Sequence, residues 1–311
     1  MIRFVPVLFL VACAGGSSDS DVEITDYVLN PADFPAPAGG EQWFGPEVVA
    51  EPYTEVQYCM FGTYAGPDVG MDAFESYQGE GGHHLILLGT SAGTDRFADG
   101  EVIDCTATGD IPMTDFEPLI NAEPLDAGRS SITLPEGYAV KLRTGQRYVV
   151  QAHYVNTTAE RRRYKDIMTI GMVPEEQVTT WAAAFALTVI DFTLPPGPSS
   201  VNFDCSFADD YQMLYLTGHL HEYGTSFRLD HKVGDATTEL YEIPVWDVNY
   251  RDAPPLQKYG PGELTIDAGT TLTTTCDWEN TEDHDLEFPA EMCATYGMLY
   301  PSLVPVVCNP W

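Results

Sequence analysis

The stretch "YAVKLRTGQRYVVQAHYVN" (residues 138–156) decides the fold class. It contains two runs rich in valine, tyrosine and other residues that favour extended backbone, and the polar triplet "TGQ" between them is typical of a turn. Related segments follow, "YQMLYLTGHLHEYGTSFRLDHKV" (211–233) and "GELTIDAGTTLTTTCDWEN" (262–280). Short strands punctuated by glycine, proline and aspartate predict an all-β protein built from β-sandwiches.

The chain has 311 residues, which is enough for two ordinary domains. The charged segments "RRRYKD" (161–166) and "VPEEQ" (173–177) precede a new apolar pattern, so we place a domain boundary near residue 178. The parts 40–178 and 179–311 then both have a common domain size. We predict two tandem antiparallel β-sandwich domains of the jelly-roll-like kind.

The composition is strongly acidic, with 47 Asp plus Glu against 14 Lys plus Arg and a formal net charge of -33. A field of that sign repels phosphate backbones, so we expect no nucleic-acid partner. It also disfavours strongly anionic substrates. A solvated acidic surface adapted to salty water accounts for the charge without any binding role.

The N-terminus "MIRFVPVLFLVACAGGSSDSD" has one arginine, a short apolar run and small residues, which is typical of a signal peptide. The tetrad "LVAC" resembles a bacterial lipobox, so we predict a lipoprotein signal over residues 1–13 with lipidation at Cys13. An ordinary signal peptide with an incidental cysteine is the alternative. Residues 14–39 are predicted to be a flexible tether. We therefore expect an exported monomer, either held to a membrane by its lipid or secreted.

Six cysteines remain after Cys13, an even number in a compartment that permits disulfides. Three disulfides are therefore expected. Six cysteines allow fifteen pairings, and their spacing alone does not choose among them.

Four of the seven histidines fall in two close pairs. In "GEGGHHLILLG" (79–89), His83 and His84 are adjacent at the start of an apolar run that resembles a buried strand. Neighbours in a regular strand point to opposite faces. Gly81 and Gly82 would permit a bulge that brings both imidazoles to one point.

In "LTGHLHEYG", His219 and His221 stand at positions i and i+2, which share one face of a strand and could clamp a metal ion. Taken one by one, these histidines could equally be structural. His153 in "VVQAHYVN" could complete a site with the first pair, and Met292 in "FPAEMCATYGMLYP" with the second, although core packing would explain either residue alone. A thioether ligand favours copper over zinc.

The ordered set "HHLILL", "QAHYVN", "GHLHEYG" and "EMCATYGMLYP" resembles the copper type II, ascorbate-dependent monooxygenases, the family of peptidylglycine α-hydroxylating monooxygenase and dopamine β-monooxygenase. The resemblance runs from about residue 40 to the end and implies two copper ions per chain, one in each β-sandwich domain. It implies an electron-transfer copper held by His83, His84 and His153. It implies an oxygen-binding, catalytic copper held by His219, His221 and Met292.

The resemblance also implies the disulfide pairing, which is Cys59–Cys105, Cys205–Cys308 and Cys276–Cys293. The last of these would fix Met292 beside its copper, because Cys293 is the next residue. The first domain has fewer cysteines than the animal enzymes, so its loops would be stapled less tightly.

One departure from the family bears on the substrate. In the peptidylglycine enzymes an arginine, an asparagine and a tyrosine grip the substrate carboxylate, and here the first two positions are Thr217 and Ala294. A carboxylate without its arginine loses its strongest anchor. Only Tyr296 remains, as a candidate residue of the substrate cleft. We therefore expect a small-molecule substrate other than peptidylglycine.

The function predicted in this way is hydroxylation of an aliphatic or benzylic C–H bond with O2 and an external one-electron reductant such as ascorbate. A non-catalytic copper-binding lipoprotein for sequestration or delivery is one alternative. Another is a cupin-like zinc or iron enzyme built on "GHLHE" with Glu222, which would need His231 or His284 as a further ligand. About two copper ions per chain would favour the first two hypotheses, and one zinc or iron the third.

Overall fold

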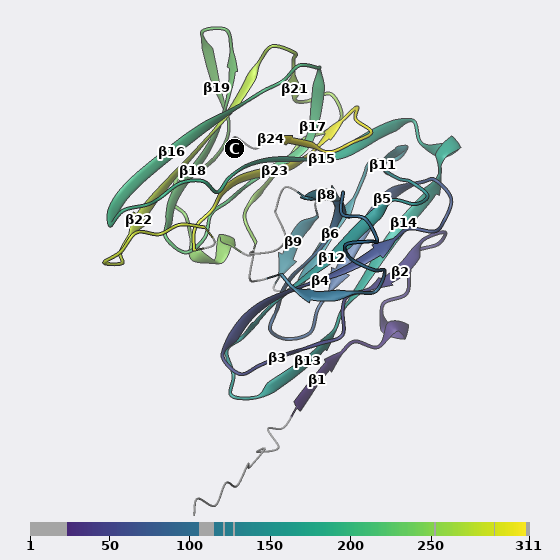
Figure 1. The fold of residues 1–311 in the computed structure, drawn as a ribbon. Coiled ribbons are helices and arrows are strands. Elements are labelled where there is room, and N and C mark those ends of the chain that lie inside the picture. The colour runs from purple at the N-terminus through teal and green to yellow at the C-terminus, as the bar shows by residue number, and fades with distance from the viewer. Residues whose placement is uncertain are drawn as a thin grey trace, which may run out of the picture.

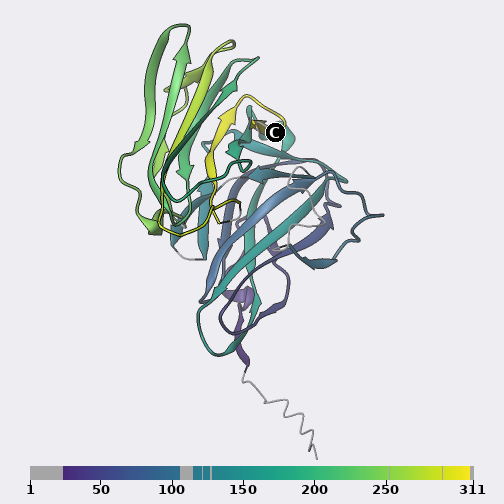
Figure 2. The ribbon, with the colours of Figure 1, turned by 60° about the vertical axis from the view of Figure 1, so that its left-hand side comes forward.

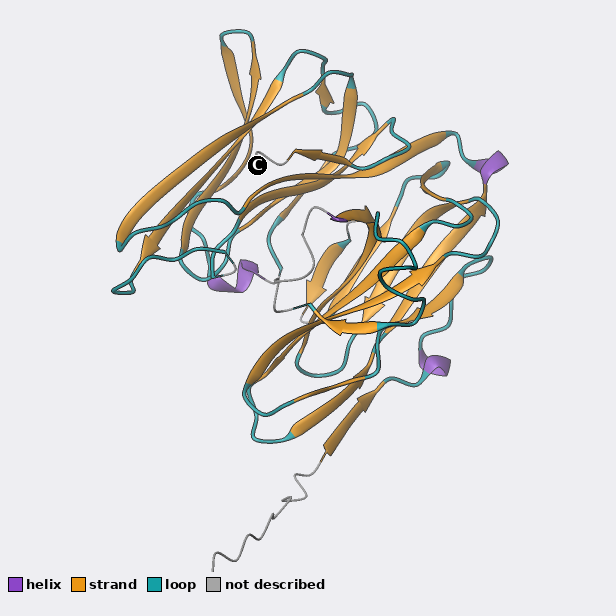
Figure 3. Ribbon diagram, in the orientation of Figure 1, coloured by secondary structure: helices purple, strands orange, loops and turns teal. Residues whose placement is uncertain are grey.

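The computed structural model describes residues 24–105, 115–120, 122–126, 128–251, 253–288 and 290–308. Strands dominate this part of the chain, and its helical elements are short 3-10 turns, among them η1 (Pro31–Asp33), η3 (Glu175–Gln177) and η4 (Val248–Arg251) (Figure 3). The chain forms two lobes, which we call the N-terminal lobe (within residues 24–178) and the C-terminal lobe (within 179–308) (Figure 1). The predicted all-β fold is confirmed.

The N-terminal lobe contains a five-stranded sheet in the order β7-β4-β12-β6-β8. Its strands are β4 (Thr54–Thr63), β6 (Gly82–Thr90), β7 (Val102–Asp104), β8 (Phe116–Ile120) and β12 (Arg147–Asn156). The layer opposite consists of β2 (Glu41–Phe44), β5 (Val69–Tyr77), β9 (Glu123–Asp126), β10 (Arg129–Thr133), β11 (Tyr138–Leu142) and β14 (Ile167–Pro174). Apolar side chains from both layers form one continuous core, so this lobe is a β-sandwich.

The C-terminal lobe is a second sandwich. Its outer sheet has the order β16-β22-β18-β19, with bounds Gly197–Ser206, Thr271–Asn280, Gly224–Val233 and Ala236–Ile243. The layer opposite consists of β15 (Thr180–Val189), β17 (Tyr211–His219), β20 (Leu256–Lys258), β21 (Thr265–Ile266), β23 (Cys293–Tyr300) and β24 (Val306–Cys308). A second core cluster fills the space between the two layers.

Strand β15 joins the two lobes into one sheet. Its first residues, Thr180–Ala182, pair in parallel with β11, and the rest of the strand pairs antiparallel with β23. Because side chains alternate along a strand, Ala184 lies in the core of the N-terminal lobe and Phe185 in the core of the C-terminal lobe. Figure 2 shows the two sandwiches from a second side. The uninterrupted apolar run at the start of the second half therefore forms strand β15, which has one core on each of its faces.

The strands expected on either side of each turn do form, but the two strands joined by a turn belong to different sheets. Strands β11 and β12 flank the predicted turn, where Gly145 has a φ of 78°, yet β11 pairs with β5 and β15 while β12 pairs with β4 and β6. Strands β17 and β18 are likewise split between the two layers of the C-terminal lobe. Each segment crosses its sandwich instead of folding back as a hairpin, so both layers receive a strand from it.

The prediction of a flexible tether over 14–39 is wrong for residues 24–28, which form a strand. Strand β1 (Ile24–Val28) pairs in parallel with β13 (Arg161–Lys165), and β3 (Val48–Ala50) completes this small sheet. The physical reason is the apolar content of β1, since the Tyr27 ring stacks on buried Tyr164 with 5.6 Å between the centroids.

The predicted signal peptide, Cys13 and residues 14–23 lie outside the described residues. Among the residues that the structure does describe, no helix has the length and hydropathy needed to cross a membrane.

The structure confirms all three expected disulfides, Cys59–Cys105, Cys205–Cys308 and Cys276–Cys293. The last one links β22 of the outer sheet to β23 of the layer opposite. Three disulfides are typical of a protein that folds in an oxidising, exported environment.

Candidate metal centres

The first histidine pair lies on a β-bulge. Along the β12–β6 ladder, His153 faces His84 and Tyr154 faces Gly82, so His83 is the extra residue of a bulge in β6. The preceding Gly81 has a φ of 91°, a region that glycine adopts readily and other residues avoid. The bulge turns two adjacent side chains towards one point, as the two glycines led us to expect.

The structure brings His83, His84 and His153 together in one cluster. The two Nδ1 atoms of His83 and His84 are 3.0 Å apart. The His153 ring centroid lies 4.5 Å from that of His83 and 4.8 Å from that of His84. One ring nitrogen from each of the three histidines can be chosen so that all lie within 4.8 Å of one another. Among the described residues this is the one group of three or more His, Cys, Asp or Glu side chains with such spacing.

The hydrogen bonds of His153 define which of its nitrogens can bind a metal. Its Nε2 is 2.9 Å from Oε1 of Glu55, a diagonal neighbour across the β4–β12 pair. A carboxylate accepts, so Nε2 carries the proton and Nδ1 keeps its lone pair. That Nδ1 is buried and has no hydrogen-bond partner in the structure. A buried lone pair without a donor is costly, and a metal ion beside His83 and His84 would satisfy it.

Burial favours the neutral form of His84 and of His153. It lowers the pKa of His153, and it lowers the pKa of His84 well below the ordinary value. The positive charges that His153, His83 and His219 would carry lower the pKa of His84 further, so the second histidine pair lies within electrostatic reach of the first. Neutral imidazole is the form that binds a metal. The donor set therefore fits a copper or zinc ion.

The second pair, His219 and His221, lies at the end of β17. The two ring centroids are 5.1 Å apart, although His221 stands beyond the last strand residue. The ring of His221 turns Nδ1 to the carbonyl of Ala290 at 3.3 Å. A carbonyl only accepts, so Nδ1 holds the proton and Nε2 carries the lone pair.

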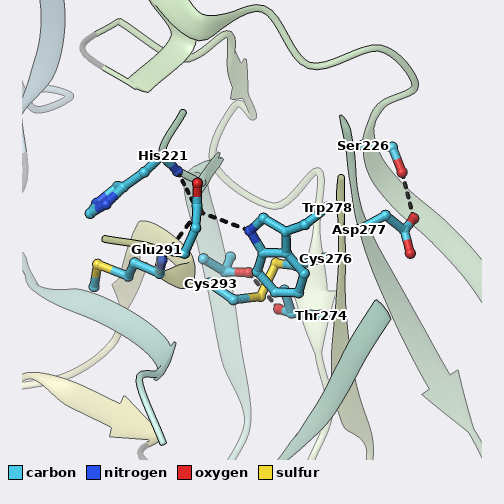
Figure 4. Close-up of a disulfide and its surroundings, with 10 residues drawn as sticks. His221, Ser226, Thr274, Cys276, Asp277, Trp278, Glu291 and Cys293 are labelled. Atoms are coloured by element: carbon cyan, nitrogen blue, oxygen red, sulfur yellow. Dashed lines mark hydrogen bonds between the residues drawn. A yellow bond between two sulfur atoms is a disulfide. The ribbon is translucent and has the colours of Figure 1, made fainter. Parts of the chain in front are cut away.

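A buried carboxylate, Glu291, organises the backbone around this second pair (Figure 4). It is 0% exposed and accepts four N–H donors, namely the backbone of His221 at 3.0 Å, Tyr223 at 2.6 Å and Met292 at 3.3 Å, and the indole of Trp278 at 2.9 Å. Burial raises the pKa of Glu291 and these donors lower it. One side chain thus ties the histidine segment to the methionine that we expect to act with it.

Met292 is 9% exposed and adjoins Cys293, whose disulfide to Cys276 spans the two layers of the lobe. The ring of Tyr296 lies 6.1 Å from that of His219, and burial raises the pKa of Tyr296 to about 12. Thr217 is buried and donates to the carbonyl of Pro255 at 3.0 Å. Tyr296 therefore lies beside the second pair, and no carboxylate-binding arginine stands at residue 217.

The cupin-like alternative finds no further ligand in the described residues. His231 lies on β18 in the outer sheet and hydrogen-bonds Thr270 at 2.9 Å, while His284 is exposed beside Asp283. Glu222 is exposed as well.

Sequence reasoning missed Glu55 and Glu291. The signal for Glu291 was present, since it precedes Met292 directly as a charged residue between apolar ones. Glu55 could be found only from the register of β4 on β12, because 98 residues separate it from His153.

Neither a known family model nor a curated protein matches the chain. Solved structures with some similarity to this chain include the major capsid protein P2 from Bacteriophage PM2, with 11% identity over 83% of this chain and 98% of that one and a TM-score of 0.35. PNGase F, a glycosylasparaginase from Flavobacterium meningosepticum, has 9% identity over 87% and 92% of the two chains and a TM-score of 0.27. Likenesses this weak carry no argument about function.

Proposed function

We propose that this protein is a copper-dependent monooxygenase that hydroxylates an aliphatic or benzylic C–H bond with O2 and an external one-electron reductant. The observation that carries the proposal is the bulge in β6, which gathers His83 and His84 around the buried, unsatisfied Nδ1 of His153. A regular strand would be the lower-energy choice if these residues only packed a core.

Copper would supply one-electron transfer at His83, His84 and His153 and activation of O2 at His219, His221 and Met292. The neutral soft sulfur of Met292 favours Cu(I) over zinc or iron. The side chains around these residues hold protons in place. Glu55 keeps the proton of His153 on Nε2, and the Ala290 carbonyl keeps that of His221 on Nδ1.

The substrate proposed for this site is small and is neutral or cationic. Thr217 is buried and engaged with Pro255, and Ala294 has no polar side chain, so neither could grip a carboxylate. The net charge of -33 also disfavours an anionic substrate. Tyr296, beside His219, offers an aromatic wall against which an apolar or benzylic group could pack.

Copper loading followed by O2 uptake tests the proposal. The wild-type chain should bind about two copper ions and consume O2 with ascorbate only when a substrate is added, in a screen of neutral and cationic aromatic and aliphatic compounds. His153→Ala should lose one copper and all turnover. His231→Ala is the matched control, because His231 is also a buried strand histidine but pairs with Thr270, and it should keep both copper ions.

Two results would overturn the proposal. One is a chain that binds two copper ions but never couples O2 uptake to a hydroxylated product, which would favour a copper-sequestering or copper-delivering lipoprotein. The other is a native preparation with one zinc or iron and no copper.

A further inference from the structure

Arg251 reaches from the C-terminal lobe into the histidine cluster of the N-terminal lobe. It is the last residue of η4, and its Nη2 lies 3.4 Å from Nε2 of His83 and 4.0 Å from Oε1 of Glu55. His83 thus turns Nδ1 towards His84 and Nε2 towards Arg251. The guanidinium of Arg251 therefore lies on the side of the His83 ring that faces away from His84.

The segment that ends in Arg251 is also tied to the second histidine pair. Trp246 is buried, and its indole N–H donates to the carbonyl of His221 at 3.0 Å. Its ring packs edge-on against Tyr250 at 5.7 Å, and the Tyr250 amide donates to Asp247 at 2.8 Å. We call residues 246–251 the bridging segment. It contacts His221 at one end and His83 with Glu55 at the other.

Glu55 has two partners that come from different lobes. It accepts from His153 at 2.9 Å and faces Arg251 at 4.0 Å. Arg251 therefore meets the first cluster at two places, at His83 and at the carboxylate that accepts from His153.

We infer that the bridging segment couples the two metal sites, and that Arg251 is a positioning residue of the first site that favours the reduced ion there. The inference rests on the proposed function. When Cu(II) takes up one electron to give Cu(I), the site loses one positive charge, so a guanidinium nearby destabilises the oxidised state more than the reduced one. The site that must pass electrons is thereby biased towards the form that can give one.

The test measures copper affinity in both oxidation states with competing chelators, in a full-length His219→Ala background that leaves the first cluster intact. Arg251→Gln removes the charge and keeps the length. We expect the dissociation constant for Cu(II) to fall about tenfold and that for Cu(I) to fall only about threefold, because Cu(I) carries half the charge of Cu(II). A tenfold fall in the ratio of the Cu(II) to the Cu(I) dissociation constant corresponds to a reduction potential about 59 mV lower for one electron.

Arg143→Gln is the matched control. Arg143 also crosses between the lobes, donating to the carbonyl of Leu303 at 3.0 Å, but it does so away from both histidine groups. It should leave the copper affinities unchanged. Trp246→Phe keeps the ring and loses the bond to His221, so we expect it to shift the first site in the same direction as Arg251→Gln, although by less.

Equal copper affinities in Arg251→Gln and Arg143→Gln would overturn the inference while leaving the proposed function untouched. The expected shift together with no substrate-dependent O2 uptake by the loaded wild type would support the coupling and overturn the monooxygenase. Absence of copper binding at His83, His84 and His153 would overturn both.

Discussion

The carboxylate of Glu291 accepts the backbone N–H of His221 at 3.0 Å, across 70 residues of sequence. The same carboxylate accepts the N–H of Met292 and the indole N–H of Trp278. The backbone around His221 and Met292 is therefore held by one buried acid. Its loss should disturb the histidine and the methionine together.

Replacing Glu291 tests this arrangement. In Glu291→Gln the amide nitrogen must face one of four N–H donors, so we expect a loss of about 1–3 kcal/mol in the free energy of unfolding. Copper stoichiometry should fall from about two to about one, because His221 and Met292 lose their common support. Urea denaturation and metal analysis provide the measurements. Glu287→Gln, at an exposed position nearby, should change neither quantity.

Met292 is the most specific ligand expected at the second site. Met292→Ile should keep the fold and the copper bound by His83, His84 and His153 but abolish turnover, since a hydrocarbon cannot replace a thioether ligand. Met298→Ile alters a fully buried core methionine of β23 and should retain turnover. Near-wild-type hydroxylation by Met292→Ile would contradict the assignment of this ligand.

Gly81 should be intolerant of a side chain. At its φ of 91°, a Cβ would lie 2.6 Å from the Tyr164 hydroxyl and 2.9 Å from Nη1 of Arg162. We expect Gly81→Ala to cost about 2–4 kcal/mol of unfolding free energy and to weaken copper binding at the bulge.

A second glycine, Gly145, distinguishes backbone strain from steric contact as the cause of that loss. It has a similar φ of 78°, and a Cβ there would meet no atom within 4 Å. Gly145→Ala should therefore cost only about 1–2 kcal/mol, from the backbone conformation alone. Equal losses in the two variants would show that contact with Tyr164 and Arg162 does not matter.

Asp166 should make the free energy of unfolding depend on pH. Burial raises its pKa from 3.8 to about 6, although Tyr154 and Gln78 donate to it at 2.7 and 2.9 Å. The folded state therefore holds this proton more tightly than the unfolded state. Its contribution to stability is fully present below pH 4 and is lost as pH rises through about 6, a change of about 3 kcal/mol.

Asp166→Asn removes this titration. Unfolding free energies measured between pH 4 and 7 should fall less steeply in Asp166→Asn than in the wild type. The difference between the two curves isolates Asp166 from the many other acidic groups. Parallel curves would mean that Asp166 titrates alike in the folded and unfolded chain.

Much of the local structure could be predicted from the sequence. The strands around residues 138–156, 211–233 and 262–280 follow from residue type and turn chemistry, which act over a few neighbours. The bulge at His83 is equally local, because Gly81 supplies the backbone conformation that it needs. The strand at residues 24–28 could not be predicted in this way, since it pairs with a strand more than a hundred residues away.

The sequence by itself determined an all-β chain, three disulfides in agreement with a family resemblance, and the histidines that stand close together along the backbone. Only the tertiary structure decided that β11 and β12 enter different sheets, that β15 joins two cores, and that Glu55 and Arg251 meet beside His153. The physical reason is that local propensities act over a few residues, whereas strand register and lobe packing depend on the burial of the whole chain. The residues that tune a site can therefore come from anywhere in the sequence.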